Sequence, residues 1–198
     1  MVIERRGLTE TCEDIILNVQ SSLYDYFTFD IRIIGSGEKR LVTKNGNDGS
    51  FDLDYNLILQ KDKKGLLSYP EKIKNLFMEA FNDYAPTYGF KSAQNSSSVI
   101  TSKHIYKSKV EFSFDIAILI EGNNGNYYKL IFDKRSNHYI WNEIKNTRNY
   151  QLKYKKVKQS GKFPQFKKRY LELKKYHLSR QDGVKSFSVF LETLNEFY

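Results

Sequence analysis

Apolar positions along the chain follow two different periods. Residues 9 to 27 repeat them at three- and four-residue steps, which predicts an amphipathic helix. The stretches at 29 to 34, 52 to 59 and 110 to 120 are instead short runs rich in branched and aromatic residues, which predict strands. Helix and strand patterns that alternate in this way predict an α/β (α+β) fold, with a mixed, twisted sheet and flanking helices.

The remaining patterns extend this fold. A second helix is expected to begin at Pro70, because proline suits the first helical turn, and to end before Pro86. A short strand is predicted at 99 to 101, and a hairpin with strands at 127 to 132 and 139 to 141. Two helices, from Pro164 and from about Ser186, are predicted to close the chain.

Two aspartates open the strand predicted at 52 to 59. Asp52 and Asp54 are two residues apart, so their side chains share one face of a strand, while Leu53 and Tyr55 take the other. Aspartate is depleted in strands, and two of them on one face repel each other. A divalent metal would supply the missing positive charge. The alternative is that both carboxylates lie on the solvent face of an edge strand.

Asp115 is a third candidate, in the middle of the strand predicted at 110 to 120. A lone charge between Phe114 and Ile116 is expensive to bury without a partner. If this strand lies beside the strand of Asp52, all three carboxylates form one cluster. Glu111 shares the face of Asp115 and is either a fourth carboxylate or a solvated strand end.

These features stand in a characteristic order along residues 8 to 141. Gly35, Ser36 and Gly37 follow the first predicted strand, the Asp-x-Asp pair opens the next, and the lone aspartate lies on a later one. This order resembles the DNA polymerase beta-type nucleotidyltransferase superfamily. The segments FDLDYNLIL and FSFDIAIL, with the hairpin that ends at Trp141, are most similar to the branch of cyclic GMP-AMP synthase and the bacterial cyclic-oligonucleotide synthases. The Gly-Thr usual between Gly-Ser and the carboxylates is replaced here by residues 39 to 45.

The resemblance implies nucleotidyl transfer with Mg²⁺ or Mn²⁺ as cofactor. In that chemistry two metals about 4 Å apart hold the attacking and leaving oxygens in line. It implies that Asp52 and Asp54 bridge both metals. Asp115 would hold the metal that activates the acceptor hydroxyl, and could accept its proton. The Gly-Ser-Gly turn would cradle the triphosphate of a nucleotide such as ATP, because glycine lets the backbone approach phosphate oxygens.

Composition excludes several other classes of protein. The chain has 198 residues and a single cysteine, so it has no internal disulfide, and a cytoplasmic location is expected. Cys12 lies at helical spacing with apolar residues, which favours a core position over a nucleophile. No apolar run approaches the length of a membrane span, and the first residues show no signal peptide. The three histidines, at 104, 138 and 177, lack the spacing of metal ligands.

The net charge of +9 is concentrated in one stretch. Ten of the eleven charged residues between 153 and 175 are positive, and aromatic residues lie among them. Such a stretch either binds a nucleic-acid backbone, such as RNA, or forms a solvated helix face. Residues 153 to 162 are predicted to be a loop, from which Lys156 or Lys158 would lean over the triphosphate. The predicted domains are a core at 1–150 and, packed on it, a basic loop with C-terminal helices at 151–198.

Together these patterns predict a nucleotidyltransferase that moves a nucleoside monophosphate from a nucleoside triphosphate to an acceptor hydroxyl. The acceptor is left open among a second nucleotide, an RNA end, a protein and a small molecule. The alternative is a non-catalytic module that keeps the sheet and holds nucleic acid with its basic stretch. Metal binding separates the two, since only the enzyme needs it.

Overall fold

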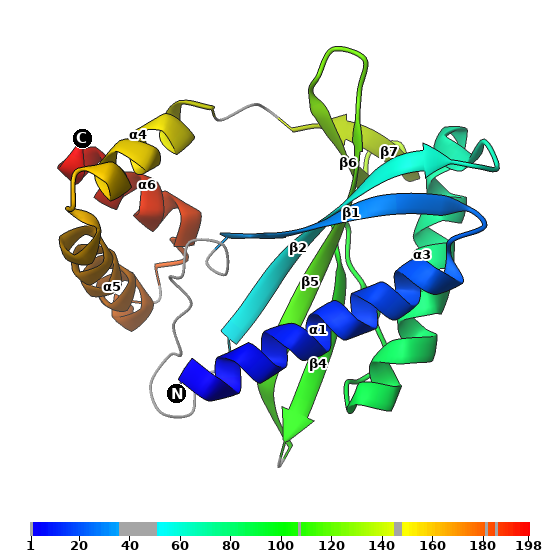
Figure 1. Ribbon diagram of the computed structural model, residues 1–198, viewed down its shortest axis with the longest axis horizontal. Helices are drawn as coiled ribbons and strands as arrows, with labels where there is room; N and C mark the ends of the chain where they lie inside the picture. The colour runs from blue at the N-terminus through cyan, green and yellow to red at the C-terminus, as the bar shows by residue number, and fades with distance from the viewer. Residues whose placement is uncertain (1, 36–50, 107, 145–147, 181, 185) are drawn as a thin grey trace. The chain divides into compact units, whose positions relative to one another are not determined.

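The computed structural model describes residues 2–35, 51–106, 108–144, 148–180, 182–184 and 186–198 (Figure 1). Two compact units divide the chain, one spanning residues 1–144 and the other residues 145–198. The sheet and the helices α1 and α3 belong to the first unit. The predicted fold class, a mixed sheet with flanking helices, is confirmed.

Helix α1 (Val2–Ser22) carries the apolar stripe expected from its sequence. Cys12, Ile15 and Val19 are completely buried. The helix begins earlier than position 9, and it ends before 27 because Phe27 already pairs with β2. Burial raises the pKa of the Cys12 thiol, so this residue is an inert part of the core, as predicted.

Three strands form the middle of the sheet. β1 (Phe27–Ile34) pairs antiparallel with β2 (Phe51–Asp62), and β2 pairs parallel with β5 (Lys109–Glu121). β2 and β5 stay in register over nine consecutive pairs, from Phe51 with Phe112 to Leu59 with Ile120. The side-by-side pairing of these two strands, on which the predicted carboxylate cluster depends, is therefore present.

Two neighbours share the other edge of β5. β4 (Ile100–Tyr106) pairs with β5 as far as Ile116, and the short β3 (Gln94–Asn95) lies outside β4. Farther along, β6 (Tyr127–Asp133) pairs with β5 from Leu119 onward. β6 then forms the predicted hairpin with β7 (His138–Glu143).

The strand predicted at 99 to 101 was too short. β4 runs to Tyr106 and includes His104. The ring of His104 is 5.5 Å from that of Phe90, centroid to centroid. Backbone pairing with β5 makes this polar segment a strand, whereas its composition alone does not indicate one.

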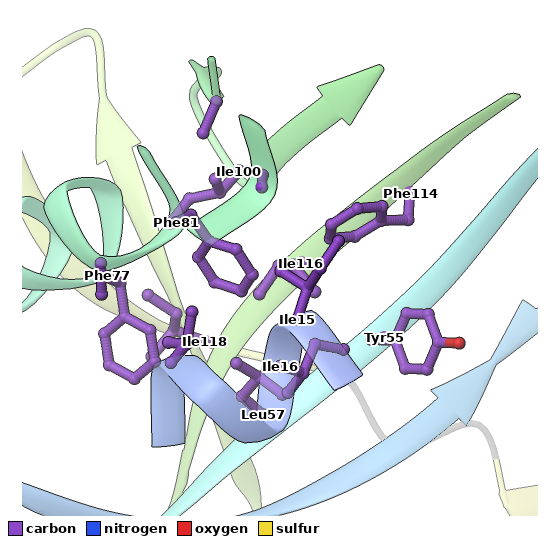
Figure 2. Close-up of a cluster of buried hydrophobic side chains, with 14 of the residues drawn as sticks. Ile15, Ile16, Tyr55, Leu57, Phe77, Phe81, Ile100, Phe114, Ile116 and Ile118 are labelled. Atoms are coloured by element: carbon purple, nitrogen blue, oxygen red, sulfur yellow. The ribbon is translucent and has the colours of Figure 1, made fainter. Parts of the chain in front are cut away.

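The two faces of the sheet have opposite character. The apolar face is covered by α1 and α3, and Figure 2 shows its buried side chains packed together. From β2 and β5 it takes Leu53, Tyr55, Leu57, Leu59, Phe112, Phe114, Ile116 and Ile118. The other face, called the polar face, takes the intervening positions and those paired with them on β4. At one end these are polar, namely Asp52, Asp54, Asn56, Ser113, Asp115, Thr101 and Lys103, and farther along β2 and β5 they are the apolar Ile58, Ala117 and Leu119. Strict alternation along both strands separates the two sets.

Helix α3 (Pro70–Tyr84) starts at the predicted proline and supplies the second layer of the core. Ile73, Phe77 and Phe81 are completely buried and recur at four-residue steps. Figure 2 shows Phe77 and Phe81 directed toward the branched side chains of β5. Lys74, beside Ile73, is also buried, and its Nζ donates a hydrogen bond to the carbonyl of Val99 at 3.0 Å.

The unit at 145–198 contains the helices α4 (Arg148–Gln159), α5 (Phe163–Arg180) and α6 (Ser186–Phe197). The loop predicted at 153 to 162 was wrong, because most of that stretch belongs to α4. Tyr154 and Val157 of α4 are buried, and the Tyr154 ring lies 5.7 Å from Phe166 and 5.3 Å from Phe190. Across the described ranges, no helix combines the length and apolar character needed to span a membrane.

Candidate active site

The predicted carboxylates lie on adjacent strands of the polar face. Asp54 of β2 is the register partner of Asp115 of β5, and Asp52 is the partner of Ser113. Paired strands are about 5 Å apart, so the backbone brings the three aspartates close together. The alternative of an edge strand is excluded for Asp54, because β2 has β1 on one side and β5 on the other at that position. Asp52 lies beyond the last described pair with β1, is flanked by β5 and is exposed.

Hydroxyl groups bind two of these carboxylates. The hydroxyl of Ser113 donates a hydrogen bond to Oδ1 of Asp52. On the other edge of β5, Thr101 of β4 faces Asp115, and its hydroxyl donates to Oδ1 of Asp115 at 2.5 Å. Among the described residues, no three His, Cys, Asp or Glu side chains are grouped closely enough to hold a metal ion.

The residues that are present fit a divalent cation of the magnesium type. Carboxylate oxygens are the donors that such hard cations prefer, and three carboxylates project from one face of two paired strands. Gly35 adds room beside them. A Cβ at position 35 would lie 2.6 Å from Oδ2 of Asp54, so the glycine leaves open a space that any other residue would fill.

Burial and neighbouring charges act together on Asp115. Burial raises its pKa, and the charge of Asp52 raises it further. The hydrogen bond from Thr101 and the charges of Lys129 and Lys103 act in the opposite direction, but the net pKa is raised. A carboxyl in such surroundings accepts a proton more readily than an exposed aspartate.

Two cations near this site were missed in the sequence. Lys103 is the register partner of Ser113, and Lys129 of β6 is the partner of Leu119. Thr101 and Lys103 are two residues apart on β4, so they share the face of Asp115 and Ser113, with which they pair. The sequence would therefore have indicated Lys103 if β4 had been predicted at its full length. For Lys129 no local signal exists, because its place depends on which part of β5 pairs with β6.

The turn predicted to bind phosphate is described only at its first residue. Gly35 has a φ of 65°, a left-handed conformation that favours glycine. Ser36 and Gly37, the other predicted residues of this turn, lie outside the described residues. Glu111 lies on β5, but its side chain is not among those described.

The predicted phosphate-binding lysines belong to the unit at 145–198. Nζ of Lys156 donates a hydrogen bond to the hydroxyl of Tyr198 at 3.0 Å, and Nζ of Lys158 lies 4.4 Å from the centre of the Tyr154 ring. Both lysines project from α4 and not from a loop. Their contact with a triphosphate stays a prediction, as does the packing of this unit on the core.

Known structures share this fold. DncV of Vibrio cholerae, bound to 3'-deoxy ATP, has a TM-score of 0.61 and 13% identity over 85% of this chain and 45% of its own. The STING-associated CdnE c-di-GMP synthase of Capnocytophaga granulosa has a TM-score of 0.62 and 18% identity, over 94% of this chain and 57% of its own. CdnG of Bradyrhizobium diazoefficiens, a CD-NTase in complex with GTP, has a TM-score of 0.53 and 16% identity, over 74% and 40%.

Sequence comparison adds nothing to this likeness. No protein-family model matches the chain, and no curated protein matches it. The chain spans about half the length of the structures it resembles. The chain thus has the nucleotidyltransferase fold, in the form that cyclic-oligonucleotide synthases adopt. The resemblance predicted from the Gly-Ser-Gly turn, the Asp-x-Asp pair and the lone aspartate is confirmed at the level of the fold.

Proposed function

We propose that this chain is a metal-dependent nucleotidyltransferase, which moves a nucleoside monophosphate from a nucleoside triphosphate to an acceptor hydroxyl. The observation that carries the proposal is the register of β2 and β5, which sets Asp54 opposite Asp115 on the polar face of a nucleotidyltransferase fold. Keeping three carboxylates ionised on that face costs free energy unless a cation compensates their repulsion. Mg²⁺ or Mn²⁺ suits the oxygen donors that they offer.

In this proposal Asp52, Asp54 and Asp115 hold the metals. In the transfer, the acceptor oxygen forms a bond to the α-phosphorus and pyrophosphate leaves. When bound, the divalent ions would supply positive charge to the attacking and leaving oxygens. Ser113 and Thr101 orient the carboxylates of Asp52 and Asp115 through their hydrogen bonds. The oxygen of Asp115 that Thr101 leaves free, Oδ2, accepts the proton of the acceptor hydroxyl, for which the raised pKa of this carboxyl is favourable.

The turn at Gly35, Ser36 and Gly37 holds the triphosphate in this proposal. Ser36 donates a hydrogen bond to a phosphate oxygen and takes no part in proton transfer. A hydrogen bond to a charged group contributes about 1.5–3 kcal/mol, which corresponds to roughly tenfold to a hundredfold. Ser36→Ala is therefore expected to lower kcat/KM by about that factor and to leave the fold intact.

A second nucleotide is the acceptor that the fold favours. The structures most informative on this point are those of DncV, described as a cyclic AMP-GMP synthase with the linear intermediate 5' pppA(3',5')pG, and of the CdnE c-di-GMP synthase. The likeness to them rests on fold, since identity is 13% and 18%. An RNA end, a protein and a small molecule remain outcomes of the test.

The test is incubation with each labelled nucleoside triphosphate and Mn²⁺, with and without RNA, followed by product mass. Asp54→Ala is expected to abolish product. Asp30→Asn is the matched control, because Asp30 lies on the same side of the neighbouring strand, opposite Ile58, and takes no part in the proposed site. Absence of product with every nucleotide, together with the same melting temperature with and without Mn²⁺, would contradict the proposal and favour the nucleic-acid-binding module.

The basic stretch is tested separately for RNA. Lys155, Lys156 and Lys158 are exposed on α4. If they bind a nucleic-acid backbone, affinity falls steeply with salt because counterions are released, and replacing all three by glutamine flattens that slope. An unchanged slope would assign these lysines to a solvated helix face.

A further inference from the structure

A lysine enters the polar face at the point where the edge of β5 changes neighbours. β4 leaves this edge at Ile116 and β6 joins it at Leu119, so Ala117 and Ile118 lie between the two pairings. Lys129 is the register partner of Leu119. Residues 115, 117 and 119 alternate onto the same side of β5, which puts Lys129 on the side of the sheet that carries Asp115.

Leu119, the register partner of Lys129, belongs to a small apolar cluster on that side. Ile58, Ala117 and Leu119 are buried there, and Val99 and Tyr127 pack against them. Lys129 is itself only half-buried. A lysine that packs its methylene groups on apolar residues can direct its ammonium along the strand toward polar ones.

The negative charges that act on Lys129 belong to the proposed metal ligands, and the charge of Lys129 also lowers the pKa of the buried Lys74 of α3. Burial lowers the pKa of Lys129, whereas the carboxylates of Asp115 and Asp54 raise it, and the net pKa is lowered. In return Lys129 lowers the pKa of Asp115. Lys103 also acts on Asp115, but Lys129 is coupled to an aspartate on each of the two strands. The ammonium thus lies within electrostatic range of the pair that faces each other across β2 and β5.

Two carboxylates in register repel each other, and partial burial increases the cost of their charges. A cation fixed nearby compensates this cost in the metal-free protein. We propose that Lys129 is the resident counter-charge of Asp54 and Asp115: it stabilises the metal-free site and opposes the entry of a divalent cation. Lys129 thus acts on the site through the carboxylates of Asp54 and Asp115 and not by contact with a substrate. The part of the proposal that concerns the metal rests on the proposed function, and the part that concerns the charge pair does not.

The charge pair is tested by a double-mutant cycle in EDTA at pH 7.5. Asp115→Asn should raise the urea midpoint of Lys129→Met more than it raises that of the wild type, because in the variant the carboxylate has lost its compensation. Equal effects in both backgrounds would overturn the proposal. If Lys129→Met does not fold, Lys129→Gln completes the same cycle. Because this cycle uses neither metal nor nucleotide, its result is independent of whether the chain transfers nucleotides.

The metal is tested by Mn²⁺ titration, with electron paramagnetic resonance of free Mn²⁺ as the readout. Removing one positive charge close to the site should tighten Mn²⁺ binding by roughly tenfold in Lys129→Met, and Mn²⁺ should raise its melting temperature more than that of the wild type. Lys129→Arg keeps the charge and should behave as the wild type. Lys134→Met is the matched control, since Lys134 is exposed in the turn of the same hairpin.

The outcomes separate the alternatives. Unchanged Mn²⁺ affinity in Lys129→Met would overturn the proposed competition. Weaker nucleotide binding with unchanged Mn²⁺ affinity would instead assign Lys129 to the triphosphate, and would also overturn it. If neither the wild type nor Lys129→Met binds Mn²⁺ while the cycle shows coupling, the charge pair stands and the proposed function fails.

Discussion

The two faces of the central sheet are made from the same strands but use them in opposite ways. Along β2, Leu53, Tyr55 and Leu57 are buried under the helices, while Asp52 and Asp54 lie between them on the other side. Along β5 the same alternation puts Phe114 in the core and the next residue, Asp115, on the polar face. One residue of displacement therefore decides whether a side chain serves the core or the proposed site.

The two faces contribute in opposite directions to the free energy of the folded protein. The apolar face lowers the free energy of the folded protein by removing side chains from water. On the polar face, repulsion between the neighbouring carboxylates raises it. Substitutions on the two faces should thus act on different quantities, stability on one and activity on the other.

The largest effect is expected from Asp54→Ala on the polar face. Transfer should fall by at least about a hundredfold, since groups that stabilise developing charge contribute that much or more. The urea midpoint in EDTA should stay unchanged or rise, because repulsion is relieved. Product formation and unfolding are measured on the same preparation. Activity in Asp54→Ala close to that of the wild type would remove this residue from the mechanism.

The next effect is expected from Leu57→Ala on the apolar face. Leu57 is completely buried among α1, α3 and the sheet (Figure 2). The free energy of unfolding should fall by about 2–5 kcal/mol, because the truncation leaves a cavity. Below the unfolding transition, KM for the nucleotide should be close to that of the wild type. A large change of KM without loss of stability would contradict the division between the two faces.

A smaller effect is expected from Gly35→Ala, at the edge of the polar face. The new Cβ would lie 2.6 Å from Oδ2 of Asp54, so the carboxylate must shift, and Mn²⁺ affinity should fall. Gly65→Ala is the matched control, because its φ of 67° is nearly the same as the 65° of Gly35 but no atom lies within 4 Å of its Cβ. Both variants should lose about 1–2 kcal/mol of stability from the left-handed backbone. Equal Mn²⁺ affinity in the two variants would show that contact with Asp54 is unimportant.

The smallest effect concerns the pH dependence of stability. The pKa of Asp115 is raised in the folded protein, so its contribution is fully present below the ordinary pKa of 3.8 and is lost as the pH rises through the folded value. Asp115→Asn should remove this loss, of order 1 kcal/mol per unit of pKa. The measurement is the urea midpoint of both proteins in EDTA at a series of pH values from about 3.5 to about 7, roughly the range in which carboxyl groups titrate. Parallel profiles for the variant and the wild type would contradict a raised pKa.

Local patterns in the sequence were sufficient for much of this fold. The helix at α3, the strands β2 and β5, the hairpin and the pair of aspartates were all predicted from periodicity and turn residues. Helix α4 was missed although Tyr150, Tyr154 and Val157 follow each other at four and three residues. The dense lysines between them obscured that stripe, and the burial of Tyr154 among rings of α5 and α6 reveals it.

The sequence by itself determined which side chains share a face, because alternation within a strand is a local property of the backbone. It therefore placed Asp52 with Asp54, and Leu53 with Tyr55. Only the tertiary structure decided which strands are neighbours, since pairing joins residues as far apart as Asp54 and Asp115. The hydroxyl partner of Asp115 and the lysine coupled to it come from β4 and β6. Their places depend on how β5 divides its edge between those two strands, and no local pattern encodes that division.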